Sequence, residues 1–276
     1  MKKKIIIIDN SNFAYSGEEI NGVTLRGTET SLILLAEQFV KMNIEVHFCN
    51  NILKTKIVNG VKYFNKKKID KSDLYNLAIV VSDAKQFDNV SALKKAVFSN
   101  SNQPFEKFLR KKQLIPFLKH KPVLVTLCNY QYHKRSFLTS FYGKKMIPIT
   151  VDPKFLNIDI DLEYLPKKKV VYNIRSNRNL DWLLDIWCKK IFPFNKDFEL
   201  YITPNIINYS DKLKAQNVFL RKIGSRSDMI EELKEYRALT YLGHKSDIFT
   251  LTCEESVKLC LPLITFGIGS ISDRVL

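Results

Sequence analysis

Short apolar runs alternate with helical patterns along this chain of 276 residues. In its first half, the pattern predicts strands at 5–8, 43–49, 77–81, 97–98 and 123–127, and helices around 32–39 and over 105–118. The helix around 32–39 carries Leu32, Leu35, Ala36 and Phe39 on one face. Strands of nearly continuous apolar residues separated by helices are typical of parallel sheets covered by helices. The pattern therefore predicts an α/β fold.

The same alternation resumes after a region of changed composition. Pro148, Pro153 and Pro166, followed by the lysine run at 167–169, interrupt the apolar pattern. Beyond them, strands are predicted at 170–174, 199–203 and 261–266, and helices over 180–187 and 255–260. We therefore predict two Rossmann-like, doubly wound domains, at residues 1–160 and 161–276.

The charge balance favours an anionic partner. Lys and Arg number 44 against 28 Asp and Glu, which leaves a formal net charge of +16. A nucleotide, a nucleic acid or an acidic membrane surface would each suit this excess. The basic clusters at 66–68, 110–112, 144–145 and 167–169 have two open interpretations: a solvated surface, or peripheral contact with anionic lipid near Phe137 and Phe141.

Several classes of protein are excluded. Charged or polar residues interrupt every apolar run before it could span a membrane. Five scattered cysteines, odd in number and without C-x-x-C spacing, indicate neither a disulfide framework nor a zinc site, so a reducing cytoplasm is expected. The histidines do not have a metal-binding spacing. The absence of a G-K-S/T loop argues against a P-loop enzyme, and the absence of a G-x-S-x-G turn argues against a serine hydrolase. No cofactor and no metal are expected.

Two carboxylates near the C-terminus are candidates for binding a ligand. Asp247 and Glu255 are separated by seven residues, and Glu255 is expected to open a helix. Such a turn can hold a pyrophosphate at the helix N-terminus while the acids bind nearby hydroxyl groups. The simpler interpretation, also open, is that Glu254 and Glu255 complement the helix dipole.

The segment from Leu242 to Val275 resembles the donor-binding segment of retaining glycosyltransferases of family 4 (glycosyltransferase group 1), which have the GT-B fold of two Rossmann-like domains facing a cleft. Asp247, Glu255, Pro262, Gly269 and Asp273 fall on the landmarks of that segment. The resemblance implies that Asp247 contacts the donor sugar and Glu255 the nucleotide ribose. Phe249 and Thr250, which lie between them, belong to the implied donor-binding segment.

Three further segments resemble the same family. Residues 21–29, with Gly22 and Gly27, resemble the loop that meets the diphosphate and the acceptor; a flexible loop with Thr28 as N-cap is the alternative. Residues 147–155 resemble the segment at the domain junction and have no catalytic role.

In the third segment, residues 172–184, a basic residue precedes a helix beginning Asn179-Leu180-Asp181, where the family has glycine in place of Asn179. The resemblance implies that Arg178 binds the donor diphosphate, and Arg175 is a second candidate. A guanidinium there would stabilise the charge of the departing nucleoside diphosphate.

The resemblance implies a metal-independent retaining glycosyltransferase in the cytoplasm, or at the inner face of the membrane. It would transfer sugar from a nucleotide-sugar donor to a hydroxyl of a polysaccharide, lipopolysaccharide or glycolipid, with Asp247 and Arg178 as catalytic residues.

Family members continue for several tens of residues past the position of Leu276, so the resemblance also implies an incomplete second domain. Two alternatives stay open, a sugar-nucleotide epimerase and a basic nucleic-acid-binding protein, although no nucleic-acid motif is present. The donor, the acceptor and the oligomeric state are not determined by the sequence.

Overall fold

The chain divides into two compact units. The structure, a computed structural model, describes residues 2–21, 25–102, 104–149, 151–161, 163–174, 178–204, 209–222 and 224–273. The first unit is Met1–Ile149 and the second is Thr150–Leu276. The sequence places this boundary at residue 160, but Val151 and Phe155 are buried with Val171 in the core of the second unit. These two apolar side chains therefore attach the segment after Ile149 to the second unit.

The first unit is built on a sheet of eight strands. They are β1 (Lys4–Ile8), β2 (Glu45–Asn50), β3 (Lys56–Val58), β4 (Val61–Asn65), β5 (Leu74–Val81), β6 (Ser91–Phe98), β7 (Val123–Thr126) and β8 (Lys144–Met146). Their order in the sheet is β3-β4-β2-β1-β5-β6-β7-β8, and every pair is parallel except β3 with β4. The α/β fold with a parallel sheet, predicted from the sequence, is confirmed for this unit.

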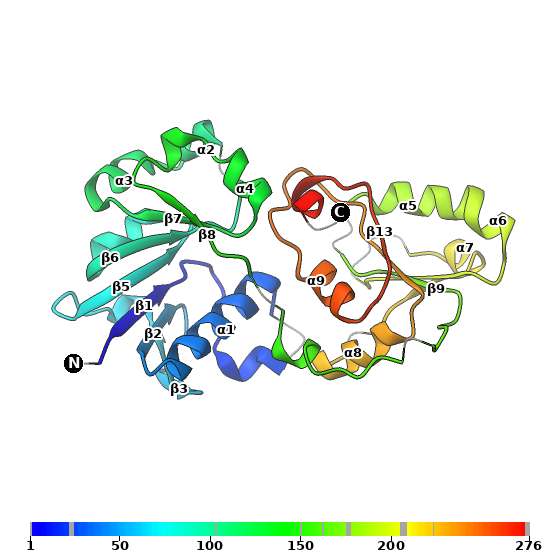
Figure 1. The fold of residues 1–276 in the computed structure, drawn as a ribbon, viewed down its shortest axis with the longest axis horizontal. Coiled ribbons are helices and arrows are strands. Elements are labelled where there is room, and N and C mark those ends of the chain that lie inside the picture. The colour runs from blue at the N-terminus through cyan, green and yellow to red at the C-terminus, as the bar shows by residue number, and fades with distance from the viewer. Residues whose placement is uncertain are drawn as a thin grey trace. The chain divides into compact units, whose positions relative to one another are not determined.

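Helices cover both faces of this sheet (Figure 1). They are α1 (Gly27–Lys41), α2 (Phe105–Arg110), α3 (Leu114–His120), α4 (Asn129–Lys134) and the 3-10 turns η1 (Gly17–Asn21), η2 (Lys66–Lys68), η3 (Ala84–Asn89) and η4 (Phe137–Thr139). The single helix expected over 105–118 is wrong, because Lys112 adopts a left-handed conformation with φ of 54° and divides it into α2 and α3. Helix α1 begins at Gly27 with Arg26 at its N-cap, so Thr28 is not the cap.

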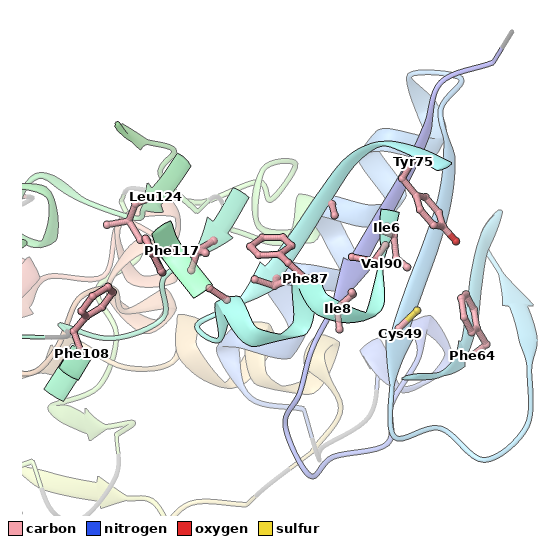
Figure 2. Close-up of a cluster of buried hydrophobic side chains, with 14 residues drawn as sticks. Ile6, Ile8, Cys49, Phe64, Tyr75, Phe87, Val90, Phe108, Phe117 and Leu124 are labelled. Atoms are coloured by element: carbon pink, nitrogen blue, oxygen red, sulfur yellow. The ribbon is translucent and has the colours of Figure 1, made fainter. Parts of the chain in front are cut away.

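One face of the sheet carries a large apolar core (Figure 2). Alternate residues of β1, Ile6 and Ile8, point into this core, as side chains of a strand alternate between its faces. Phe108 of α2 and Phe117 of α3 meet there with ring centroids 5.0 Å apart. Burial of these side chains, each worth about 1.5–3 kcal/mol, fixes the short helices on the sheet and thus the loops at its edge.

The second unit has a smaller, wholly parallel sheet. Its strands are β9 (Lys169–Tyr172), β10 (Glu199–Ile202), β11 (Val218–Leu220), β12 (Ala238–Thr240) and β13 (Leu263–Ile264), in the order β11-β10-β9-β12-β13. Its helices are α5 (Leu180–Ile186), a π-helical turn (Trp187–Ile191), α6 (Phe192–Phe194), α7 (Asp211–Lys214), α8 (Arg226–Lys234) and α9 (Leu251–Lys258), with 3-10 turns at Pro153–Phe155 and Gly269–Asp273. The predicted doubly wound architecture is therefore present in this unit too.

The strand orders locate the places where ligands bind in such folds. In the first sheet the chain builds outward from β1 to β2 and β4, then returns to the other side of β1 with β5. In the second sheet it builds from β9 to β10 and β11, then returns with β12. Ligands of open α/β sheets bind outside the carboxyl ends of strands at such switch points. The helices in the described ranges are all too short or too polar to span a bilayer.

Candidate active site

The switch point of the second sheet brings together two loops that are distant in the sequence. The chain leaves β9 at Tyr172 and enters α5 at Leu180, and it leaves β12 at Thr240 and enters α9 at Leu251. Because β9 and β12 are parallel neighbours, both loops emerge at the same edge. Arg178 lies on the first loop and Asp247 on the second.

Arg178 and Asp247 form an ion pair at this edge. Arg178 Nε lies 3.1 Å from Asp247 Oδ1, and their side chains are 20% and 9% exposed. The hydroxyl of Tyr241 donates a hydrogen bond to the other carboxylate oxygen, Asp247 Oδ2, at 2.6 Å. Burial, and then the bond to Asp247, raise the pKa of Tyr241, so its hydroxyl keeps the proton that it donates.

His244 adds a third polar group to this pair. Its Nδ1 lies 3.4 Å from Arg178 Nη1 and accepts a hydrogen bond from the backbone N–H of Ser246 at 3.1 Å. The Ser246 hydroxyl lies 2.7 Å from the same nitrogen. Since a backbone N–H can only donate, Nδ1 carries no proton in this arrangement.

Arg178 and the adjacent Asn179 are each held by a hydrogen bond. The Tyr172 hydroxyl donates to the Arg178 carbonyl at 2.8 Å, and Asn179 Nδ2 donates to the Gly243 carbonyl at 3.2 Å. Asn179 has φ of 65°, in the left-handed region that favours glycine and that Asn tolerates better than other side chains. Asn179 therefore adopts the backbone conformation for which the family pattern has a glycine.

The loop 243–250 is supported by the glycine loop that follows β13. A Cβ at Gly269, where φ is 81°, would lie 2.3 Å from the His244 carbonyl oxygen, so only glycine allows this approach. The backbone N–H of Ser270 donates to the Asp247 carbonyl at 3.0 Å. The close approach to the His244 carbonyl explains why a glycine stands at position 269, and the two contacts together place His244 and Asp247 on a packed loop.

Glu255 lies in a different environment from the one expected. Helix α9 begins at Leu251, so Glu255 does not open it, and the expectation that it does is wrong; Thr250 takes the N-cap position. Glu255 is 3% exposed, and Arg226 Nη2 lies 2.6 Å from its Oε1. Arg226 also lies with its Nε 3.2 Å from Asp152 Oδ2.

This buried network keeps Glu255 apart from Arg178. Burial raises the pKa of Glu255 above its usual value of 4.5, although the charge of Arg226 acts in the opposite direction. Among the residues that the structure describes, no ion pair or hydrogen bond joins Glu255 to Arg178 or Asp247. The structure thus brings together two of the three principal predicted residues.

The other predicted site residues have varied positions. Thr250 is buried at the N-cap of α9, and Phe249 precedes it with partial exposure. Gly27 is the first residue of α1, and its carbonyl accepts the Ser31 hydroxyl at 2.6 Å. Gly22 and Arg175 lie outside the described residues. In the described part of the chain, His, Cys, Asp and Glu side chains do not gather in groups of three that could hold a metal ion.

Sequence reasoning missed the residues that support the pair. Tyr241 and His244 precede Asp247, the acid that the sequence singled out, by six and three residues, and the nearby histidine was an available signal. Arg226 had none, because it lies 29 residues from Glu255 in a segment without a motif. Only the packing of α8 and α9 in one unit joins them.

No protein-family model matches the sequence, and a search of curated proteins finds no match. Solved structures do match. The sucrose-phosphate synthase from Thermosynechococcus elongatus has a TM-score of 0.68 at 9% identity, over 100% of this chain and 84% of that chain. The HepE protein of Anabaena, in complex with UDP and glucose, has a TM-score of 0.67 at 11% identity, over 99% and 83%. WaaG, a glycosyltransferase involved in lipopolysaccharide biosynthesis, has a TM-score of 0.61 at 9% identity, over 97% and 82%. These matches confirm the predicted GT-B fold.

Proposed function

We propose that this protein is a glycosyltransferase, which moves a sugar from a nucleotide-sugar donor to a hydroxyl acceptor with retention at the anomeric carbon. The observation that carries the proposal is the ion pair of Arg178 and Asp247 at the switch point of the second sheet. HepE, whose structure is similar to this one, was solved in complex with UDP and glucose. A cation next to a carboxylate suits a ligand that has phosphates at one end and sugar hydroxyls at the other.

Arg178 is proposed to bind the donor diphosphate. Its Nε is engaged by Asp247 and its Nη1 faces His244 Nδ1, so Nη2 and the second hydrogen of Nη1 are left to donate to phosphate oxygens. The leaving diphosphate gains negative charge as the glycosidic bond breaks, and a fixed cation stabilises that charge most in the transition state. Arg178 would therefore act on the rate as well as on binding.

Asp247 is proposed to orient the donor sugar. Each of its oxygens has one partner, Arg178 or Tyr241, and a carboxylate can accept about four hydrogen bonds. Two acceptor positions thus suit sugar hydroxyls. Holding the sugar beside the diphosphate contributes through orientation, and the reaction needs no strong protein nucleophile.

Glu255 is proposed to bind the nucleotide ribose through Oε2 while Arg226 holds Oε1. In this arrangement Arg226 is a positioning residue for the carboxylate. Phe249, Thr250, Gly22, Gly27 and Arg175 complete the proposed donor contacts on the strength of the family resemblance alone.

The proposed setting is a reducing cytoplasm, with a glycan or lipid-linked acceptor. The five cysteines all lie in described residues and form no disulfide, and Cys49, Cys128 and Cys253 are buried. Phe137 is 75% exposed, next to the exposed Leu138, and Lys145 follows on an exposed edge. An apolar ring with nearby cations suits the surface of an anionic membrane. Vesicles that fail to co-sediment with the protein at low salt, with or without acidic lipid, would contradict this contact.

Nucleotide binding tests the proposed donor site. Titration calorimetry with UDP, GDP and ADP should detect binding of at least one, and Arg178→Ala should abolish it. Lys190→Ala, which removes an exposed cation of the same unit, is the matched control and should bind normally. The absence of binding for all three nucleotides, or normal binding by Arg178→Ala, would contradict the site.

Product analysis tests the reaction. NMR spectra of the product should show the donor sugar attached to an acceptor hydroxyl with its anomeric configuration retained. Conversion of a nucleotide sugar in the absence of any acceptor would instead favour the epimerase. Salt-sensitive binding to oligonucleotides that UDP and GDP do not affect would favour the nucleic-acid-binding alternative.

A further inference from the structure

The first unit has a hollow of about 650 Å³ at its own switch point. It lies where the chain leaves β1, β5 and β6, and residues from the turn between α2 and α3 complete its wall. This place is equivalent in topology to the one where Arg178 and Asp247 meet in the second unit. None of the candidate donor residues lines it.

The wall of the hollow is rich in cations. Lys85, Arg110, Lys111 and Lys112 line it, and all four are exposed. Within the part of the chain that the structure describes, none of the four takes part in a salt bridge. Burial, followed by the charges of Lys111 and Arg110, lowers the pKa of nearby Lys107, as a concentration of positive charge would.

The two carboxylates of the hollow are already occupied by neutral donors. Asp9 is buried and accepts hydrogen bonds from the Ser11 hydroxyl at 2.8 Å and from the Tyr15 hydroxyl at 2.7 Å. Asp83 Oδ1 accepts from Gln113 Nε2 at 2.8 Å. These acids organise the loops, and they leave the four cations without an anionic partner in the described residues.

A buried glutamine holds the two cationic segments on one hollow. Gln113 is 1% exposed; its Oε1 accepts the Ala84 N–H at 2.9 Å, and its Nε2 donates to Asp83. It thereby joins the segment of Lys85 to that of Arg110–Lys112. Ser82 and Lys112, on opposite sides of this link, both have left-handed φ values, 58° and 54°. Such strained residues persist where the surroundings hold them and gather at ligand sites.

A helix dipole does not account for the cluster. Cations are favoured at the C-terminal end of a helix, but α2 has only six residues and only Arg110 belongs to its last turn among the lining cations. Lys85 lies on η3, after a different strand. The cluster therefore needs another explanation.

The remaining lining groups suit hydroxyl recognition. Ser11 and Ser82 contribute hydroxyls, and Asn10 and Asn100 contribute amides, from the ends of β1, β5 and β6. Hydroxyls and amides both donate and accept, as the hydroxyls of a sugar do. Cations beside such groups match a molecule with a phosphate at one end and hydroxyls at the other.

We propose that this hollow binds a sugar phosphate, with its phosphate on Lys85, Arg110 and Lys111 and its hydroxyls toward Ser82 and Asn100. That this sugar phosphate is the phosphorylated end of the proposed glycan or lipid-linked acceptor rests on the proposed function, whereas the binding itself does not. The hollow would then choose, among hydroxyl compounds, those that carry an anionic group.

The test uses glucose 6-phosphate as the probe and glucose as its uncharged match. Calorimetry at low salt should detect glucose 6-phosphate binding by the unaltered protein and none of glucose. The triple variant Lys85→Gln/Arg110→Gln/Lys111→Gln should bind the probe at least about tenfold more weakly, since charge-assisted bonds to phosphate are lost. Lys112 is left in place because its backbone is left-handed.

The control removes the same charge from elsewhere in the first unit. Lys3, Lys41 and Lys71 are exposed and lie before β1, at the end of α1 and before β5, away from the lining of the hollow. The variant Lys3→Gln/Lys41→Gln/Lys71→Gln should bind the probe like the unaltered protein. No binding of the probe, equal losses in the two triple variants, or equal binding of glucose would overturn the proposal.

Nucleotide titrations separate this proposal from the proposed function. The hollow variant should keep its affinity for whichever of UDP, GDP and ADP the unaltered protein binds, and Arg178→Ala should keep its affinity for glucose 6-phosphate. If no nucleotide binds but the probe binds through the hollow, the proposed transferase fails and the sugar-phosphate site stands. If nucleotides bind and the probe does not, the sugar-phosphate site fails and the proposed transferase stands.

Discussion

At the switch point of the second sheet, Arg178 is paired with Asp247 and largely buried. At the switch point of the first sheet, Lys85, Arg110 and Lys111 are exposed and form no salt bridge with any residue that the structure describes. The two sheets have the same kind of strand order, so topology alone does not produce this difference. It comes from the loops, which carry the chemistry of a fold.

The comparison separates two uses of charge. A buried ion pair is part of the structure, because loss of one partner leaves the other charge without compensation. An exposed cation contributes little to stability and keeps its donors for a ligand. Mutations in the second unit should therefore change stability and binding, whereas mutations in the hollow should change binding alone.

The largest effect is expected at Arg226. Arg226→Ala leaves Glu255 and Asp152 as buried carboxylates without their cation and should lower the free energy of unfolding by about 3 kcal/mol. Trp182 and Trp187 both lie in the second unit, so tryptophan fluorescence during urea unfolding reports on it. Lys111→Ala should change the free energy of unfolding, measured by scanning calorimetry, by no more than about 0.5 kcal/mol. A loss below about 1 kcal/mol for Arg226→Ala would remove the distinction between the two regions.

The next effect is on the reaction. Arg178→Ala should lower kcat/KM by about 10²- to 10³-fold, because a preorganised donor to the leaving diphosphate is lost. Arg178→Lys keeps the charge without the planar fork, so it should recover only part of the rate. Steady-state kinetics with the nucleotide sugar identified by calorimetry is the measurement. Full activity of Arg178→Lys would show that a point charge suffices.

A smaller effect is expected at Tyr241. Tyr241→Phe removes the hydroxyl that donates to Asp247 and should lower the free energy of unfolding by about 1.5 kcal/mol. It should also weaken nucleotide binding, since Asp247 and Arg178 lose part of their fixed geometry. Fluorescence-detected unfolding and UDP titration check both. Unchanged values in both experiments would mean that the hydrogen bond does not position the pair.

The turn at Asn179 should respond weakly. Asn179→Ala places a less tolerant side chain at φ of 65° and should cost about 1 kcal/mol, whereas Asn179→Gly should cost less. The ranking of the two variants by urea unfolding is the informative quantity. If alanine is tolerated as well as glycine, the left-handed conformation is not what selects the residue.

A gradual effect of pH is expected from Glu255. Burial raises its pKa above 4.5, so the folded state holds the proton more firmly than the unfolded state. The stability from this group is therefore full below about pH 4.5 and is lost as the pH rises through the folded-state pKa. The free energy of unfolding of the unaltered protein should fall relative to Glu255→Gln over that range. A difference that is independent of pH, or that grows in favour of the unaltered protein, would contradict this direction.

The strands that were predicted correctly are the buried ones. Ile5–Ile8 and Leu77–Val81 are apolar throughout because parallel strands are covered on both faces. The strands that sequence reasoning missed are short or polar, such as β8 with Lys144 and Lys145, and β12 with only three residues. Pairing with neighbours makes these segments strands, and their own composition does not.

The amino-acid sequence alone was enough to predict the α/β class, the two doubly wound units, and Arg178 and Asp247 as candidate site residues. Apolar periodicity and short motifs are local properties of a sequence, so they can be recognised without the structure. Only the tertiary structure decided which charges meet. The parallel strands β9 and β12 bring Arg178 to Asp247 across 69 residues. Arg226 forms a buried ion pair with Glu255, and Gln113 links the two segments whose cations line the hollow. Such contacts depend on strand order, which decides which loops meet, and on burial. Burial lowers the dielectric around a charge, so the charge needs a partner, and that partner cannot be identified from a local sequence pattern.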